Sequence, residues 1–78
     1  MTGKYYRHFK GNLYRVLYIA KHSETLEDIV VYQAMYGEKG IWVRPKAMFE
    51  EIIERDGKTF RRFSPISVED AEMVIDRM

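Results

Sequence analysis

The sequence predicts a small, mostly β domain that ends in a short helix. Three observations support this fold class. Short runs rich in β-branched and aromatic residues recur along the chain, turn signals containing glycine separate them, and apolar residues take a helical spacing only near the end. The sequence also predicts one helical turn before the last strands, which is typical of SH3-like barrels. We therefore expect a small SH3-like barrel of five to six short strands.

The length of the chain fits one domain. We expect residues 1–78 to form this single domain, with the barrel over residues 1–65 and the helix over residues 66–78. A chain of this size buries only about 60% of the surface that it exposes when unfolded. Its 14% of aromatic residues therefore serves the core first, so richness in tyrosine is weak support for a binding function.

Composition excludes several classes of function. The net charge is +1, so bulk charge does not favour nucleic-acid binding. The absence of cysteine excludes disulfides and thiolate chemistry. Residues 1–5 do not resemble a signal peptide, and no apolar run approaches the roughly 18 residues of a membrane helix. We expect a cytoplasmic protein that has no membrane partner and no cofactor.

The first half of the chain contains the strands with the clearest pattern. The expected strands cover residues 3–10, 13–22, 29–36 and 41–44. The second of them is apolar on both faces, which predicts a bend and cover on both sides along part of its length. Residues 36–40 form a hairpin connection, in which we assign a positive φ to Gly37 and Gly40.

Pro45 stops the fourth strand and begins a short helical element. Its φ is fixed near the helical value and it has no N–H to leave unpaired, so it suits the first position of a helix. We therefore expect one helical turn over residues 45–49. This turn stands before the last strands and is the feature that suggests an SH3-like topology.

A second hairpin follows the helical turn. The aspartate–glycine pair at residues 56–57 is among the strongest two-residue turn signals, and strand-like segments flank it. A two-residue loop there pairs Ile53 with Phe60 and Glu51 with Arg62. Both pairings are favourable, which supports this register.

We expect the sheet to end at residues 64–65 and a helix to follow. Ser67 is a good N-cap, and Asp70 three residues later completes a weaker version of the capping box. One helical stripe then contains Val68, Ala71, Val74, Ile75 and Met78. The stripe allows the helix to pack either on the barrel or on a partner.

An ordered set of short motifs resembles a known family. The motifs are YRHFKG at residues 6–11, HSET at 22–25, VVY at 30–32, YG at 36–37, Gly40, WVRP at 42–45 and Met48-Phe49. Together they resemble the small bacterial domain-of-unknown-function family numbered sixteen fifty-three. The resemblance implies a compact, β-rich domain of SH3-like type, and it supplies no activity. The residues after Pro65 lie outside it.

Trp42 and Arg44 are the most informative residues for function. In a strand, positions i and i+2 share a face, so these two side chains point the same way and Ile41 and Val43 point the other way. If the aliphatic pair faces the core, an indole and a guanidinium lie side by side in solvent. If Trp42 faces the core, it is an ordinary core residue.

The pattern favours a non-enzymatic binding module with an aromatic and arginine face. The candidate ligand-binding residues are Arg7, His8, His22, Glu24, Tyr32, Tyr36, Trp42 and Arg44. The rings would stack and the arginines would recognise anions or carbonyls, with His22 and Glu24 at the rim. A peptide, protein or small ligand is the favoured partner. The structural alternative places Tyr32 and Trp42 in the core, pairs Arg44 with a carboxylate and makes His8 a hydrogen-bonded structural residue.

Two other functions stay open. Basic residues interleaved with aromatic ones could bind a single-stranded nucleic acid. A small hydrolase-type enzyme could use His22 as a general base oriented by Glu24, although neighbours on an extended chain face opposite ways, which argues against a triad there. The histidines show no ligand spacing, so we assign no metal site and no catalytic residue.

Overall fold

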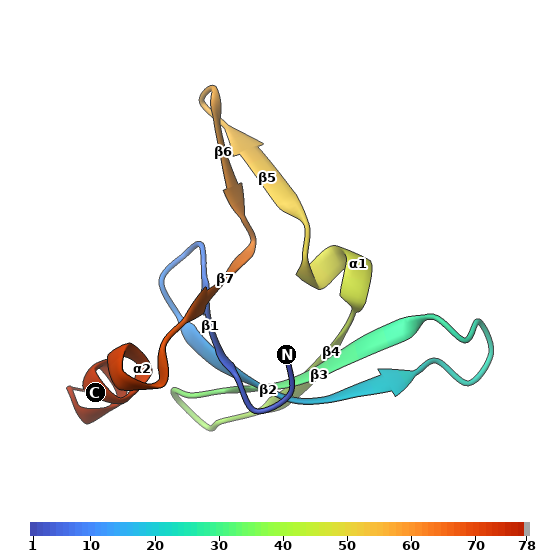
Figure 1. The fold of residues 1–78 in the computed structure, drawn as a ribbon, viewed down its shortest axis with the longest axis horizontal. Coiled ribbons are helices and arrows are strands. Elements are labelled where there is room, and N and C mark those ends of the chain that lie inside the picture. Colours follow the sequence, from blue (N-terminus) through green and yellow to red (C-terminus); the bar gives the residue numbers. More distant parts are fainter. Residues whose placement is uncertain (78) are drawn as a thin grey trace.

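The computed structural model describes residues 1–77. The elements along these residues are β1 (Tyr5–His8), β2 (Leu13–Lys21), β3 (Asp28–Ala34), β4 (Ile41–Pro45), α1 (Lys46–Phe49), β5 (Ile52–Arg55), β6 (Lys58–Arg61), β7 (Phe63–Ile66) and α2 (Val68–Asp76). Five strands form an antiparallel sheet in the order β4-β3-β2-β1-β7, while β5 and β6 form a separate hairpin. In Figure 1 this hairpin rises away from the sheet as an arm, and the β2–β3 loop extends as a second arm.

The sheet is open. Strands β4 and β7 lie at its opposite edges and do not pair with each other. The predicted mostly β class, the helical turn and the terminal helix are confirmed. The sheet does not close into the predicted barrel, and residues 1–77 contain seven strands where five to six were expected. The barrel stays open because the β5–β6 hairpin stands apart as its own two-stranded sheet instead of joining the two edges.

The bend predicted in the long second strand is a β-bulge at Leu17. The pairing of β2 with β3 shifts between Val16, which faces Tyr32, and Tyr18, which faces Val31. A bulge adds one residue to one strand and increases the local twist. Because of the extra residue, odd-numbered side chains of β2 lie on one face before the bulge and on the other face after it. Apolar residues therefore occupy both sides of the pattern that simple alternation gives for this strand.

The core lies on one face of the sheet and is largely aromatic. Its buried cluster consists of Val16, Val30, Tyr32, Phe49 and Phe63. Phe49 reaches this face from α1, and the rings of Tyr6 and Tyr14 pack against the cluster from β1 and β2. Aromatic pairs at these separations add favourable edge and stacking contacts to the burial of their surface, which helps a small domain to fold.

Residues 64–65, expected to end the sheet, lie inside a strand. Pro65 pairs with Tyr6 in the ladder between β7 and β1. Proline is tolerated there because β7 is an edge strand, in which half of the backbone N–H groups have no ladder partner to lose. The prediction that the sheet ends at Pro65 is therefore wrong, because this proline lies within β7.

The β5–β6 hairpin has the predicted register. Ile53 faces Phe60, and the Arg62 backbone N–H donates to the Glu51 carbonyl at 2.9 Å. The Arg62 guanidinium also lies 2.9 Å from the Glu51 carboxylate. Both turn residues 56–57 have positive φ, of 53° and 76°, which explains why aspartate and glycine occupy them.

Helix α2 follows β7 and lines a groove together with Arg7 of β1 and Ile66 of β7. The Ser67 hydroxyl accepts the Asp70 backbone N–H at 3.1 Å, so the predicted N-cap is confirmed. Ala71 is fully buried, whereas Val68 is exposed, so only part of the predicted stripe is covered. Met78 lies outside the described residues. Neither helix in residues 1–77 is long and apolar enough to cross a membrane.

Candidate binding surface

Strand β4 is exposed on both of its faces. Trp42 faces Tyr32 and Arg44 faces Val30, so both side chains lie on the core side of the sheet, as the shared-face prediction requires. Trp42 nevertheless keeps 59% of its surface exposed, and Ile41 and Val43 on the opposite face keep 61% and 67%. Neither pair is core, because β4 is the edge strand and the core cluster ends at β3.

Gly40 fixes the position of the exposed indole. A Cβ at this glycine would lie 3.3 Å from Trp42 Nε1, so the ring lies close over the glycine backbone. The positive φ expected at Gly37 is confirmed at 57°, but Gly40 is not among the glycines with positive φ. Glycine is needed at position 40 because a side chain there would crowd the Trp42 ring. The contact with Gly40 holds the indole against β4.

Arg44 has no ion-pair partner in the part of the chain that the structure describes. The salt bridges there join Lys21 to Asp28 and Arg62 to Glu51. The predicted alternative, in which a carboxylate neutralises Arg44, therefore does not apply within residues 1–77. The guanidinium shares the core side of β4 with Trp42, so an unpaired cation and an exposed ring occur together.

His8 lies on the same side of the sheet and has a structural role. Its Nδ1 accepts the Lys10 backbone N–H at 3.2 Å, and its ring packs edge-on against Phe63. Burial lowers the pKa of His8, and the positive charges of Arg62, Arg44 and Lys10 lower it further. Positive charge therefore gathers near His8, although the Glu51 carboxylate 2.9 Å from Arg62 neutralises part of it and the net charge of the chain is only +1.

The tyrosines divide between core and rim. Tyr32 is only 6% exposed, so the structural alternative for this residue is confirmed. Tyr36 is half-buried, and its hydroxyl lies 2.6 Å from that of Tyr14. Burial and this hydrogen bond raise the pKa of Tyr14 to about 12. Tyr36 is thus anchored at the start of the connection that leads to Trp42.

The structure separates one residue from the predicted face. Arg7 alternates with His8 along β1, pairs with Leu13 and points to the opposite side of the sheet. There it lines a groove of about 260 Å³ with Met73 and Val74 of α2. Of the predicted residues on the core side, Tyr32 is buried in the core. The other four are His8, Tyr36, Trp42 and Arg44, and we call these four the Trp42 surface.

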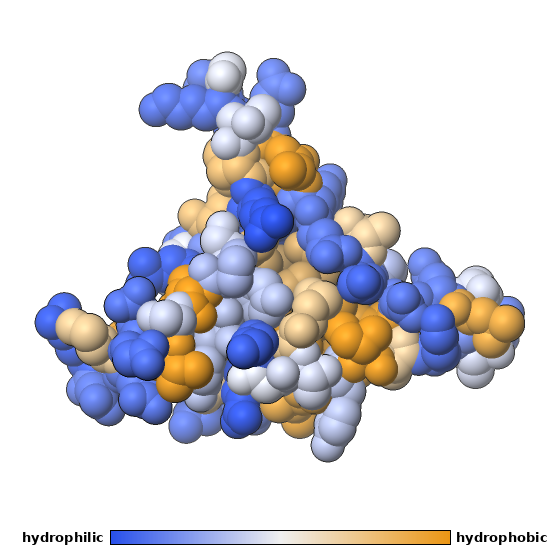
Figure 2. Space-filling view, viewed as in Figure 1, coloured by the Kyte–Doolittle hydropathy of each residue, from blue (hydrophilic) through white to orange (hydrophobic). Residues whose placement is uncertain are grey.

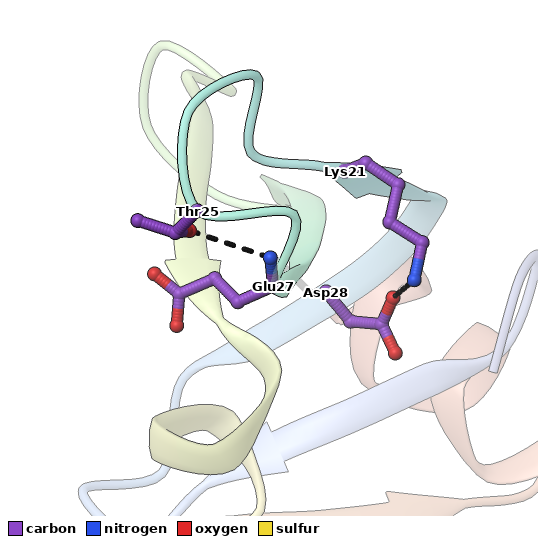
Figure 3. A network of polar contacts seen from close by, with 4 residues as sticks. All are labelled: Lys21, Thr25, Glu27 and Asp28. Atoms are coloured by element: carbon purple, nitrogen blue, oxygen red, sulfur yellow. Dashed lines mark hydrogen bonds and ion pairs between the residues drawn. The ribbon is translucent and has the colours of Figure 1, made fainter.

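His22 and Glu24 lie in the loop between β2 and β3, which Figure 1 shows at the end of an arm, whereas Trp42 pairs with Tyr32 farther along β3. The Nδ1 of His22 accepts the backbone N–H groups of Glu24 at 3.1 Å and Thr25 at 3.3 Å. Figure 3 shows the neighbouring contacts in this loop, a bond from the Glu27 N–H to Thr25 and the ion pair of Lys21 with Asp28. The imidazole closes the loop, and Glu24 reaches it through its backbone.

Sequence reasoning missed Tyr14 and Arg62 as neighbours of this surface. Tyr14 holds Tyr36, and Arg62 contributes to the field at His8. Tyr14 and Tyr36 are 22 residues apart, so no pattern of neighbouring residues predicts their contact. Arg62 was expected only to pair with Glu51 across the hairpin. Among residues 1–77, no three His, Asp or Glu side chains cluster as metal ligands would.

The open sheet, the aromatic core and the exposed edge residues define a small antiparallel β-sheet domain. The chain belongs to the family described as "Protein of unknown function (DUF1653)", which matches residues 4–65, so the predicted family is confirmed. It is similar to the crystal structure of a protein of this family from Bordetella bronchiseptica. The two share 29% sequence identity over 86% of this chain and 88% of the other, with a TM-score of 0.75. No curated protein matches the chain.

Proposed function

We propose that this domain is a non-enzymatic binding module that recognises an extended peptide on the Trp42 surface. This proposal rests on the exposure of the only tryptophan beside Arg44, which has no ion-pair partner within residues 1–77. Burial of an indole is a large gain for a small domain, so folding alone does not explain an exposed one. Tryptophan and arginine are also the side chains that most often dominate interface energetics.

The shape of the surface favours a peptide over a compact small molecule. Three hollows formed by residues 1–77 are lined by other residues and contain neither Trp42 nor Arg44. Small molecules are usually enclosed by concave sites, whereas an extended peptide can lie along a sheet edge. The indole would pack on an apolar side chain, and the guanidinium would donate to a carbonyl or carboxylate. We also propose that this fold is related to SH3-like domains, since the helical turn α1 precedes the last strands.

The proposal is tested by selecting peptides from a random display library on the immobilised domain. We expect the selected peptides to lose at least about thirtyfold in affinity with Trp42→Ala, the effect of an interface hot spot. The matched control is Ile52→Ala, because Ile52 is 62% exposed on the β5–β6 arm. Peptides that bind Trp42→Ala as tightly as the wild type would contradict the proposal.

One observation favours a second candidate, a single-stranded nucleic acid. The charges of Arg62, Arg44 and Lys10 act together at His8, on the side of the sheet that carries Trp42. Stacking on aromatic rings combined with such cations is how many domains bind single strands. Anisotropy titrations with a labelled oligothymidine should then show a linear loss of log affinity with log salt, and a shallower slope for Arg44→Ala. An absence of binding at low salt excludes this candidate.

A further inference from the structure

We propose that a hollow at the base of the β5–β6 arm binds a free amino acid with a small side chain. The residues that line this hollow include Met1, Tyr6, Phe49, Glu50, Arg61 and Phe63, and we call it the Tyr6 hollow. No residue of the Trp42 surface lines it, so this binding is separate from the proposed peptide recognition. Figure 2 shows hydrophilic side chains beside hydrophobic ones where the arm leaves the sheet.

The inner wall of the Tyr6 hollow is aromatic and fixed by the core. Phe49 and Phe63 are buried and stack on each other, and Tyr6 meets the Phe49 ring edge-on with centroids 5.2 Å apart. Met1 packs against the same core cluster. Because these side chains are held by the fold, the hollow is formed before a ligand binds, as is usual for small-molecule sites.

Two side chains of opposite charge line the hollow and do not neutralise each other. Glu50 ends the helical turn α1, and Arg61 is the last residue of β6. The backbone bond of 2.9 Å between their neighbours Arg62 and Glu51 closes the base of the arm and places both charges there. Neither Glu50 nor Arg61 forms an ion pair within residues 1–77. A ligand with one positive and one negative group can therefore bind to both.

The Tyr6 hydroxyl is a third polar group at this hollow. Burial raises the pKa of Tyr6, the charge of Glu50 raises it further, and the charge of Arg61 lowers it. Both charges therefore act at this hydroxyl, which shows that the three polar groups converge. Within residues 1–77 the hydroxyl has no hydrogen-bond partner, so it is free to donate to a ligand. An apolar hollow with a few convergent polar groups is typical of a small-molecule site.

The charges and the size of the hollow identify the class of ligand. The Arg61 guanidinium and the Tyr6 hydroxyl would donate to a carboxylate, the Glu50 carboxylate would accept from an ammonium group, and the rings would pack on a short side chain. The space that the centres of water-sized groups can reach is about 80 Å³. One water needs about 10–15 Å³ of such space, so the hollow accommodates roughly five to eight groups of this size. Glycine and alanine have this charge pattern and this size.

The exposure of the two charged side chains sets the strength that we expect. Glu50 and Arg61 are both exposed, so water and salt screen their contacts with a ligand. Binding should therefore be weak, with a Kd on the order of 1 mM for alanine.

Titration of the isotope-labelled domain with L-alanine up to about 50 mM, followed by two-dimensional proton–nitrogen NMR, tests the proposal. We expect saturable shifts of the amide signals of Tyr6, Glu50 and Arg61. Propionate lacks the ammonium group of alanine and ethylamine lacks its carboxylate. Each of them should bind at least about threefold more weakly than alanine, because each leaves one charge of the hollow without a partner.

Substitutions at the hollow separate its three polar groups. Arg61→Met and Glu50→Gln should each weaken alanine binding at least about threefold. Tyr6→Phe keeps the ring and removes the hydroxyl, which should weaken binding about two- to tenfold. Arg55→Met and Glu54→Gln are the matched controls, with the same changes on the same arm at residues that do not line the hollow. Both controls should bind alanine as the wild type does.

A wild type without saturable shifts, or with shifts confined to residues outside the hollow, overturns the proposal. Arg61→Met or Glu50→Gln with the affinity of the wild type also overturns it, and these two exposed positions carry the test if Tyr6→Phe lowers stability. Propionate or ethylamine that binds as tightly as alanine would reject a zwitterionic ligand. Peptides selected on the Trp42 surface should bind Arg61→Met unchanged, so the two proposals fail independently.

Discussion

The ring of Phe49 lies flat on the ring of Phe63, with centroids 4.1 Å apart and planes inclined by 4°. Phe49 ends α1 and Phe63 begins β7, so the stack joins the two ends of the segment that contains the β5–β6 arm. Both rings are buried in the core cluster. The arm can therefore stand away from the sheet while its base is fixed by one aromatic contact.

Phe49→Ala or Phe63→Ala should lower the free energy of unfolding by about 3–5 kcal/mol, because each leaves a cavity in the core. The double variant should lose less than the sum, since the same contact is removed by either change. Urea unfolding followed by circular dichroism measures all three. Strict additivity would show that the two rings contribute independently.

Trp42→Ala should lower the free energy of unfolding far less than Phe49→Ala does. About 40% of the indole surface is covered, which corresponds to at most about 2.5 kcal/mol by area. The same urea experiment compares this variant with Phe49→Ala. Acrylamide should also quench the emission of Trp42 strongly in the folded protein. A loss of stability equal to that of Phe49→Ala would mean that Trp42 is a core residue.

His8 should make stability fall in mildly acidic solution. Its pKa in the folded chain is lowered from 6.5, so the unfolded state takes up the proton first. The stability is fully present above pH 6.5 and declines as the pH falls toward the lower folded value. His8→Phe keeps an aromatic ring in place and should flatten this part of the stability profile. An unchanged profile would assign the acid sensitivity to other groups.

The field at His8 can be measured directly. Arg44→Met removes one of the three cations that lower the His8 pKa, so the histidine should titrate at a higher pH in this variant. Proton NMR of the His8 imidazole follows this shift, with the wild type titrated under the same conditions as the reference. An unmoved His8 would mean that Arg44 does not contribute to the positive potential of the Trp42 surface.

The pair Tyr14 and Tyr36 gives a spectroscopic signature. Tyr36→Phe removes the hydrogen bond to Tyr14, so the Tyr14 pKa should fall from about 12. It should remain above the usual value of 10.0, because burial is the larger cause of the shift. Ultraviolet titration at alkaline pH measures the change. The variant should lose about 0.5–1.5 kcal/mol of stability, the net contribution of one hydrogen bond.

Sequence reasoning succeeded where a few neighbouring residues decide the structure. The Asp56-Gly57 turn set the pairing of Ile53 with Phe60, and Ser67 capped the helix as predicted. The opposite directions of Trp42 and Val43 also followed from strand alternation. These features depend on turn geometry, on one side-chain acceptor and on the period of the backbone.

Sequence reasoning failed where contacts between distant segments decide the structure. Pro65 looked like the end of the sheet, and only its place beside β1 makes it part of an edge strand. The assignment of Arg7 and His8 to one face is a different kind of error, because the alternation of side chains along β1 alone places these neighbours on opposite sides. His22 was weighed as a base, and the fold of its own loop occupies its Nδ1.

The sequence by itself determined the family, the mostly β class, the β5–β6 register and the fact that Trp42 and Arg44 share one face of their strand. The tertiary structure alone decided that the sheet stays open and that β4 is its edge. Strand order and cover depend on contacts between residues far apart in the chain, such as Phe49 with Phe63. Because the core ends at β3, both faces of β4 remain exposed, and Trp42 keeps more than half of its surface in solvent.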